Sequence, residues 1–183
     1  MTNTIADAMR AMGEADVGII NGGFVRGDKT YDEGDKLTVG DVLFELPFPK
    51  PIAVVRLRGD LLALALEQHL RGCPEPNGRY PHVSSNVRME YDPQQPPLQR
   101  ICFLAVDGEQ VDAQKEYSVC ITEFMARGGD GIDAYTMGVP QPIRPHRVAY
   151  VVRDYLRERG ASGISALEDR VRVAHKDAHQ TNT

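Results

Sequence analysis

The chain has 183 residues, 42% of them hydrophobic and 26% charged, a balance typical of one globular domain with a sizeable core. Its formal net charge of −5 argues against a nucleic-acid-binding surface, which would normally carry clustered lysines and arginines. No stretch approaches the ~20 apolar residues of a membrane span, and the first four residues lack the features of a signal peptide. We therefore expect a soluble chain with no nucleic-acid partner.

Helix and strand signals alternate at the start of the chain. A helix is predicted from Thr2 or Asn3 to Gly13, because side chains that can cap it precede apolar residues on one face. Residues 16–20 are predicted to form a short buried strand. This strand delivers Asn21 and two glycines at its carboxyl end, where binding loops are common.

Similar signals continue to residue 72. Thr38 has the features of a helix start, and Pro47 ends this helix. Residues 52–58 are predicted to form a strand. Asp60 is expected to cap a helix over residues 61–70.

The second half contains a series of strands. Residues 87–91, 101–106 and 117–121 have the composition of strands, and Asp107-Gly108 predicts a tight turn between two of them. We expect these strands to form a meander.

The last helix is predicted over Val148 to Leu156, whose apolar residues recur at helical spacing, with Gly160 beyond its end. A short apolar run at 171–173 follows, and residues 174–183 are expected to form a disordered tail. The whole pattern predicts one α/β or α+β domain over residues 1–173 with a mixed sheet.

Residues that often carry chemistry offer no recognisable catalytic arrangement. Cys73, Cys102 and Cys120 show no metal-binding spacing, so buried free thiols are favoured, and a Cys102–Cys120 bridge stays open. His82 and His146 have no nucleophile or carboxylate placed beside them by a motif, so surface or loop histidines are expected.

Two glycine segments, residues 21–26 and 124–131, are the strongest functional signal. Each places paired glycines, which permit close backbone approach, beside a side chain that can hold a ligand. Phe48 lies between two prolines, which stiffen the chain on both sides of its ring. Together these features indicate a nucleotide site.

At these segments the chain resembles the C-terminal domain of the 5′-nucleotidase family, which includes UDP-sugar hydrolases and ecto-nucleotidases. Residues 3–9 resemble its Asn-Leu-Ile-x-Asp-Ala-Met opening, and residues 21–26 resemble Asn-Gly-Gly-Gly-Ile-Arg. Pro47-Phe48 and residues 124–131 follow at similar spacing. Phe24 departs from the pattern, because it stands where the family has a third glycine.

The resemblance implies a layered α/β/β/α domain that grips a nucleotide or nucleoside. In such enzymes of nucleotide catabolism, a separate N-terminal metallophosphoesterase domain with two divalent metals, of the Zn or Mn type, hydrolyses the phosphoester. We expect that domain to be this chain's partner, and we expect no cofactor, no metal and no turnover in the chain alone. The resemblance also suggests a periplasmic or extracellular location for the full-length protein.

The family's nucleoside contacts fall on three positions. By resemblance, Phe48 and Phe124 sandwich the nucleobase, against the alternative that both are core phenylalanines. Asp130 accepts hydrogen bonds from the two ribose hydroxyls, against the alternative of a turn-forming Asp. A diguanylate-cyclase motif is excluded because Gly131 follows Asp130 where that motif has Glu.

The remaining contacts fall in the first glycine segment. The resemblance places Arg26 and Asn21 at the phosphate end, against the alternatives of a surface Arg and a turn Asn. Gly22 and Gly23 let the backbone come close to the ligand.

Two other functions stay open at this point. The chain can be a non-enzymatic nucleotide-sensing or interaction domain that kept the fold, an alternative that Phe24 motivates. An independent hydrolase is the least favoured alternative.

Overall fold

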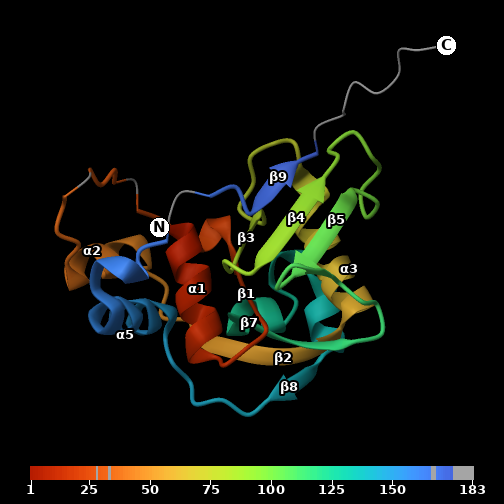
Figure 1. The fold of residues 1–183 in the computed structure, drawn as a ribbon. Helices are drawn as coiled ribbons and strands as arrows, with labels where there is room; N and C mark the ends of the chain where they lie inside the picture. The colour runs from red at the N-terminus through yellow and green to blue at the C-terminus, as the bar shows by residue number, and fades with distance from the viewer. Residues whose placement is uncertain (28, 33, 166–167, 175–183) are drawn as a thin grey trace.

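The computed structural model, which describes residues 1–27, 29–32, 34–165 and 168–174, contains two β-sheets with helices packed against them (Figure 1). The first sheet has five strands in the order β3-β1-β7-β2-β8. Only β1 and β7 pair in parallel; the other neighbours are antiparallel. Its strands are β1 Val17–Asn21, β2 Ile52–Arg58, β3 Pro81–Val83, β7 Glu116–Thr122 and β8 Val139–Gln141.

The second sheet has four strands in the order β6-β5-β4-β9. It is also mixed, since β4 and β9 are parallel while the other neighbours are antiparallel. Its strands are β4 Val87–Tyr91, β5 Ile101–Val106, β6 Glu109–Gln110 and β9 Val171–Val173. The predicted α/β class with a mixed sheet is therefore confirmed.

Helices cover both faces of the five-stranded sheet. α1, α2 and α5 pack on one face, around an apolar cluster that includes Ile20, Val54 and Cys120 (Figure 1). α3 lies on the other face and also contacts β5 of the second sheet. The helices are α1 Thr2–Met12, α2 Val39–Glu45, α3 Gly59–His69, α4 Glu123–Ala126 and α5 Val148–Arg159, with 3-10 turns η1 Gly22–Phe24, η2 Leu70–Gly72, η3 Gly129–Gly131, η4 Asp133–Met137 and η5 Gly160–Gly163.

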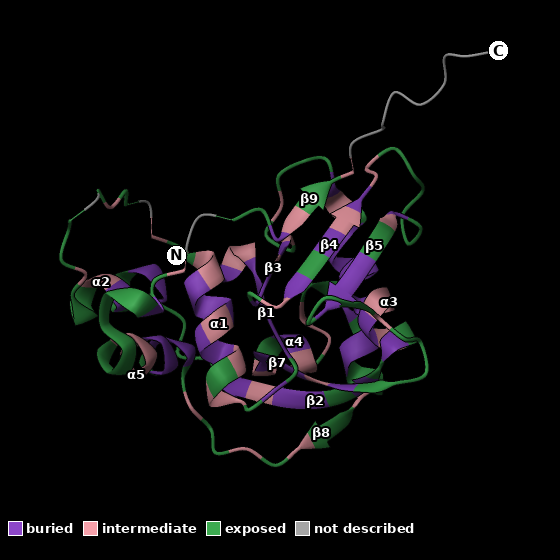
Figure 2. Cartoon of the chain, in the orientation of Figure 1, coloured by how far each residue is buried: buried purple, intermediate pink, exposed green. Residues whose placement is uncertain are grey.

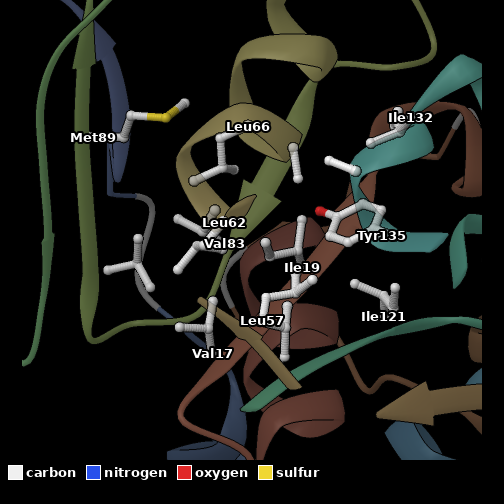
Figure 3. Close-up of a cluster of buried hydrophobic side chains, with 14 of the residues drawn as sticks. Val17, Ile19, Leu57, Leu62, Leu66, Val83, Met89, Ile121, Ile132 and Tyr135 are labelled. Atoms are coloured by element: carbon white, nitrogen blue, oxygen red, sulfur yellow. The ribbon is translucent and has the colours of Figure 1, made fainter. Parts of the chain in front are cut away.

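The larger apolar cluster lies between the two sheets and α3 (Figure 3). Ile19 and Leu57 contribute to it from the five-stranded sheet, Leu62 and Leu66 from α3, and Met89 from the four-stranded sheet. Successive side chains of a strand point to opposite faces, and both faces of the five-stranded sheet pack against an apolar cluster. This explains why every residue of β1 is buried, as predicted for that strand (Figure 2).

Two predicted helix starts have different outcomes. Thr38 and Asp41 form a reciprocal capping box, in which each side chain accepts a hydrogen bond from the other residue's backbone N–H, so this start is confirmed. The prediction that Asp60 caps the next helix is wrong, because β2 runs directly into α3 and extended Arg58 occupies the cap position. Asp60 lies in the first turn, where a carboxylate interacts favourably with the helix dipole.

The predicted meander is only partly correct. β4, β5 and β6 are antiparallel neighbours, and Asp107 and Gly108, both at positive φ, form the predicted tight turn after β5. This turn leads into the short β6, which was not predicted, rather than into residues 117–121. β7 instead crosses to the other sheet and lies between β1 and β2. It has buried side chains on both faces, which only a central strand of the doubly covered sheet can satisfy.

The cysteines and one histidine also correct the sequence analysis. Cys102 is exposed on β5 while Cys120 is buried on β7, so they lie in different sheets and the bridge is excluded. Cys73 and Cys120 are buried free thiols as expected, and burial raises the pKa of Cys120 to about 12. His82 is not a surface or loop residue, because it lies half-buried within β3 and desolvation lowers its pKa to about 4.

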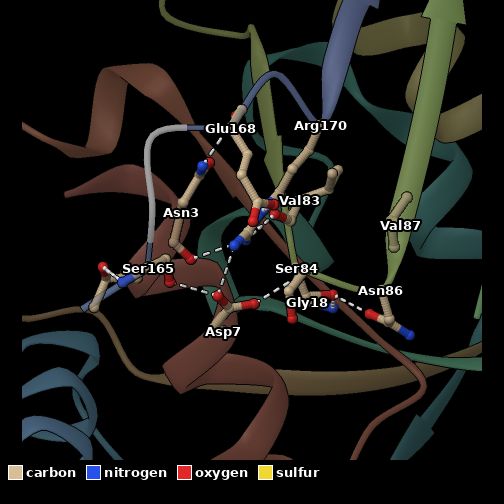
Figure 4. Close-up of polar contacts among 12 residues, drawn as sticks. Asn3, Asp7, Gly18, Val83, Ser84, Asn86, Val87, Ser165, Glu168 and Arg170 are labelled. Carbon is tan, nitrogen blue, oxygen red and sulfur yellow. Dashed lines mark hydrogen bonds and ion pairs between the residues drawn. The ribbon is translucent and has the colours of Figure 1, made fainter. Parts of the chain in front are cut away.

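A buried ion pair joins the segment before β9 to α1 (Figure 4). Arg170, which is 3% exposed, lies 2.9 Å from the Asp7 carboxylate on α1 and donates to the Val83 carbonyl. Asp7 also accepts hydrogen bonds from Ser85 N and Ser165 Oγ. The network therefore joins α1, β3 and the segment that leads into β9.

The predicted tail, residues 174–183, lies outside the described residues except for Ala174, whose N–H donates to the Tyr91 carbonyl. Among the described residues, no helix is long and apolar enough to cross a membrane.

Candidate functional site

Four chain segments converge at one end of the strands of the five-stranded sheet. The parallel strands β1 and β7 end there, and the antiparallel strands β2 and β3 begin there. Asn21 therefore lies near Phe124, which follows β7, and near the segments that precede β2 and β3.

These segments enclose a cavity of about 240 Å³. Six of the seven predicted site residues line it, and Gly22 does not. The lining residues are Asn21, Gly23, Phe24, Arg26, Phe48, Lys50, Gly78, Phe124 and Asp130.

The first glycine segment packs its backbone directly on a second chain segment. The Gly23 N–H donates to the Gly78 carbonyl at 2.8 Å, and the Gly22 N–H donates to the Tyr80 carbonyl at 2.9 Å. A Cβ at Gly23 would lie 3.0 Å from the Gly78 oxygen, so a larger residue would push the two segments apart. The close approach predicted for this glycine is used here against the protein's own backbone.

Asn21 and Asp130 are hydrogen-bonded partners, although they are far apart in sequence. The Asn21 amide, which is 4% exposed, donates through Nδ2 to Asp130 Oδ2 at 2.8 Å and to the Gly78 carbonyl at 3.3 Å. Its Oδ1 is buried and accepts no hydrogen bond from the described residues. A buried acceptor without a donor costs about 1–3 kcal/mol, so the two hydrogen bonds that Nδ2 donates have to offset this cost.

Asp130 occupies a left-handed backbone conformation, with φ of 59°. Asp adopts this region more readily than most residues do, and such positions are enriched at ligand sites. The conformation turns the chain sharply within η3, so that the side chains of both Phe124 and Asp130 line the cavity.

The two predicted stacking residues are exposed phenylalanines rather than core residues. Phe48 is 36% exposed and Phe124 is 40% exposed. The Phe124 ring lies directly against Gly129, where a Cβ would come within 2.5 Å of the ring. A glycine at position 129 is therefore needed for this ring position.

Phe24 supports the other aromatic ring. It is 4% exposed and packs against Phe48, with ring centroids 5.5 Å apart and planes inclined by 58°. The Arg26 guanidinium lies 5.4 Å from the Phe48 centroid, which is cation–π distance. The residue that replaces the family's third glycine thus forms part of the cavity wall.

Lys50 and Gly78 also line the cavity, and sequence analysis missed both. Lys50 lies two residues after Phe48 in a segment stiffened by three prolines, so its position relative to Phe48 was a usable signal. Gly78 lies in a Pro- and Gly-rich loop, and its contact with Gly23 depends on tertiary structure alone.

A larger cavity, about 830 Å³ in volume, lies elsewhere, near the start of α1 and the segment before α2. It contains none of the predicted site residues. The buried Glu45 carboxylate in its wall accepts a hydrogen bond from the Tyr31 hydroxyl at 3.0 Å. Within the described part of the chain, no group of three or more His, Cys, Asp or Glu residues could hold a metal ion.

Comparison with known proteins identifies the family of this chain. The family model described as the 5′-nucleotidase C-terminal domain matches residues 1–137. The trifunctional nucleotide phosphoesterase protein YfkN of Bacillus subtilis is 31% identical over 143 residues, which cover 73% of this chain and 10% of that protein.

Solved structures share the fold over nearly the whole chain. A 5′-nucleotidase precursor from Thermus thermophilus matches with a TM-score of 0.83 and 27% identity, over 94% of this chain and 34% of that chain. The sulfate thiohydrolase SoxB matches with a TM-score of 0.72 at 22% identity, over 93% of this chain and 31% of that chain, which shows the fold alone.

The chain thus spans about a tenth of the length of YfkN and about a third of the length of the two solved structures. The family match extends over both glycine segments and the whole lining of the cavity. The chain belongs to the 5′-nucleotidase C-terminal domain family.

Proposed function

We propose that this chain is the nucleotide-substrate-binding domain of a 5′-nucleotidase-type phosphohydrolase. One observation carries the proposal: a single cavity gathers two exposed aromatic rings, a carboxylate and two cationic side chains from separate segments of the chain. Flat rings suit a nucleobase, a carboxylate suits a vicinal diol, and cations suit a phosphate.

Phe48 and Phe124 hold the nucleobase in this proposal. Base–aromatic stacking is worth about 1–3 kcal/mol per base and tolerates different bases. Phe24 and Arg26 pack on Phe48, so little side-chain freedom is lost when a base stacks on it.

Asp130 accepts hydrogen bonds from the ribose hydroxyls, and Asn21 orients that carboxylate through the 2.8 Å hydrogen bond. Arg26 binds the phosphate, and Lys50 adds a second positive charge to the cavity. The lining then carries two cations and one carboxylate in a protein with a net charge of −5, which favours an anionic ligand.

Hydrolysis belongs, in this proposal, to an N-terminal metallophosphoesterase domain outside this sequence. Two divalent metals in such a domain activate water and stabilise the phosphoryl transition state. The residues described above bind and orient the substrate, so we expect the chain alone to bind nucleotides without hydrolysing them.

Isothermal titration calorimetry with AMP, UDP-glucose and adenosine tests this proposal. We expect at least one nucleotide to bind, and Asp130→Asn to weaken the binding of ligands that carry both ribose hydroxyls. The same substitution should change the affinity for a 2′-deoxynucleotide less, because one hydroxyl is already absent. Lack of binding by all three ligands at millimolar concentration would refute the site.

A further inference from the structure

The end of α3 contacts two segments that each contribute a residue to the cavity. We call residues 77–80 the Gly78 loop and residues 128–137 the Asp130 segment. Neither α3 nor its side chains line the cavity. Four contacts nevertheless run from the end of this helix and the following η2 to these two segments.

His69 contacts both segments at once. Its side chain is completely buried, Nδ1 is hydrogen-bonded to the Arg79 carbonyl in the Gly78 loop, and Nε2 lies 3.1 Å from the Tyr135 hydroxyl in the Asp130 segment. A carbonyl only accepts, so Nδ1 carries the proton and Nε2 accepts from Tyr135. Burial lowers the pKa of His69 to about 4, which keeps this tautomer neutral at physiological pH.

The neighbouring side chains of α3 and η2 add contacts to the Asp130 segment. Gln68 Oε1, on a residue 6% exposed, accepts a hydrogen bond from the Ala134 N–H at 3.0 Å. Arg71 Nη1 lies 3.5 Å from the Gly131 carbonyl. The Asp130 segment is thus contacted at three points, two from the end of α3 and one from η2.

The two segments meet again at Asn21. The Gly78 carbonyl accepts from the Gly23 N–H and from Asn21 Nδ2, and Asp130 accepts from the same Asn21 amide. A closed ring of contacts results, from His69 through the Gly78 loop to Asn21, then through Asp130 back to Tyr135. The contacts of His69 and those of Asn21 therefore lie on the same ring.

We propose that His69 is a positioning residue that sets the separation of the Gly78 loop and the Asp130 segment, and thereby the geometry in which Asn21 and Asp130 meet a ligand. This inference rests on the proposed nucleotide-binding function for its effect on affinity. The ring of contacts itself does not depend on that function.

Tyr135→Phe tests the proposal with almost no change in shape. It removes the donor to His69 Nε2, so we expect AMP affinity to fall about tenfold, because a buried acceptor loses its partner. Tyr117→Phe is the matched control: Tyr117 is also buried in the same cluster, and its hydroxyl accepts from Asp112 N, away from both segments. This control should lower stability without changing affinity.

A double-mutant cycle separates positioning from general destabilisation. His69→Asn keeps a donor near the Arg79 carbonyl and loses the acceptor for Tyr135, so adding Tyr135→Phe to it should cause no further loss of affinity. Independent, additive losses would overturn the proposal. So would unchanged AMP affinity in a folded Tyr135→Phe variant.

Amide hydrogen exchange supplies a readout without ligand. The Gly23 N–H, which donates to the Gly78 carbonyl, should exchange faster in Tyr135→Phe than in Tyr117→Phe at equal global stability. Equal exchange rates would overturn the positioning role. If the wild-type chain bound no nucleotide, the proposed function would fail, while this measurement would still decide the role of His69.

Discussion

The five-stranded and four-stranded sheets differ in how many faces are buried, and only the first carries the candidate site. Helices α1, α2 and α5 cover one face of the five-stranded sheet, and α3 covers the other. The four-stranded sheet alternates buried and exposed residues along β4, as Figure 2 shows, and its outer face carries charged residues such as Arg88. A sheet packed on both faces is closely packed around its strands, so it is a suitable support for side chains at the strand ends.

The comparison also separates two uses of exposed phenylalanine. Phe124 follows the central strand β7 and lines the cavity, whereas Phe103 lies on β5 of the four-stranded sheet and is equally exposed, at 40%. Exposure alone therefore does not distinguish the two rings. Only Phe124 lies where the ends of the central strands converge, and the proposed stacking role rests on that position.

The largest effect is expected where the two sheets are joined rather than at the site. Arg170→Ala leaves the Asp7 carboxylate buried without its ion-pair partner, so we expect the free energy of unfolding to fall by about 3–5 kcal/mol. Urea denaturation measures this loss. Nucleotide affinity, measured under conditions in which the variant is folded, should remain that of the wild type. A loss of affinity in the folded variant would show that the Arg170–Asp7 ion pair also affects the site.

Acid should destabilise the fold through His69. Its pKa is about 4 in the folded chain and 6.5 when unperturbed, so the unfolded state binds more protons between these values. The free energy of unfolding should therefore fall by about 3 kcal/mol from this group as the pH drops from 6.5 to 4. Denaturation at a series of pH values tests this, and His69→Gln should remove the share of His69 from the loss. A further loss from His82, whose pKa is also lowered to about 4, should remain across the same window.

The matched phenylalanines give the sharpest test of the contrast between the sheets. Phe124→Ala should weaken nucleotide binding by about 1–3 kcal/mol, the value of one base–aromatic stack. Phe103→Ala, on a residue of equal exposure, should leave binding unchanged. Calorimetric titration of both variants decides the matter, and similar losses in the two would argue against a stacking role for Phe124.

Lys50 should produce the smallest effect. Its side chain is exposed, and exposed ion pairs are worth about 0.2–1 kcal/mol, so Lys50→Gln should weaken AMP binding only a few-fold and leave adenosine binding unchanged. Affinities for AMP and adenosine, measured at low and high salt, report this difference. An equal loss for both ligands would place Lys50 at the nucleoside rather than near the phosphate.

Much of the secondary structure followed from local patterns. The predicted strands 52–58, 87–91 and 101–106 agree with β2, β4 and β5, and the Thr38 capping box is present. Side-chain alternation, turn residues and caps act within a few residues, so a sequence window contains the whole signal. The errors at Asp60 and Cys102 arose where a helix start or a strand face depended on what packs nearby.

The sequence by itself determined the longer helices and strands, the family and the residue types at the candidate site, but it did not predict the short β3, β6 and β8. Only the tertiary structure decided that β7 joins the five-stranded sheet, that Asn21 donates a hydrogen bond to Asp130, and that Lys50 and Gly78 line the cavity. The physical reason is that strand order depends on which faces of distant segments can be buried together. Contacts between residues about a hundred positions apart exist only after that burial has brought the sheet edge together.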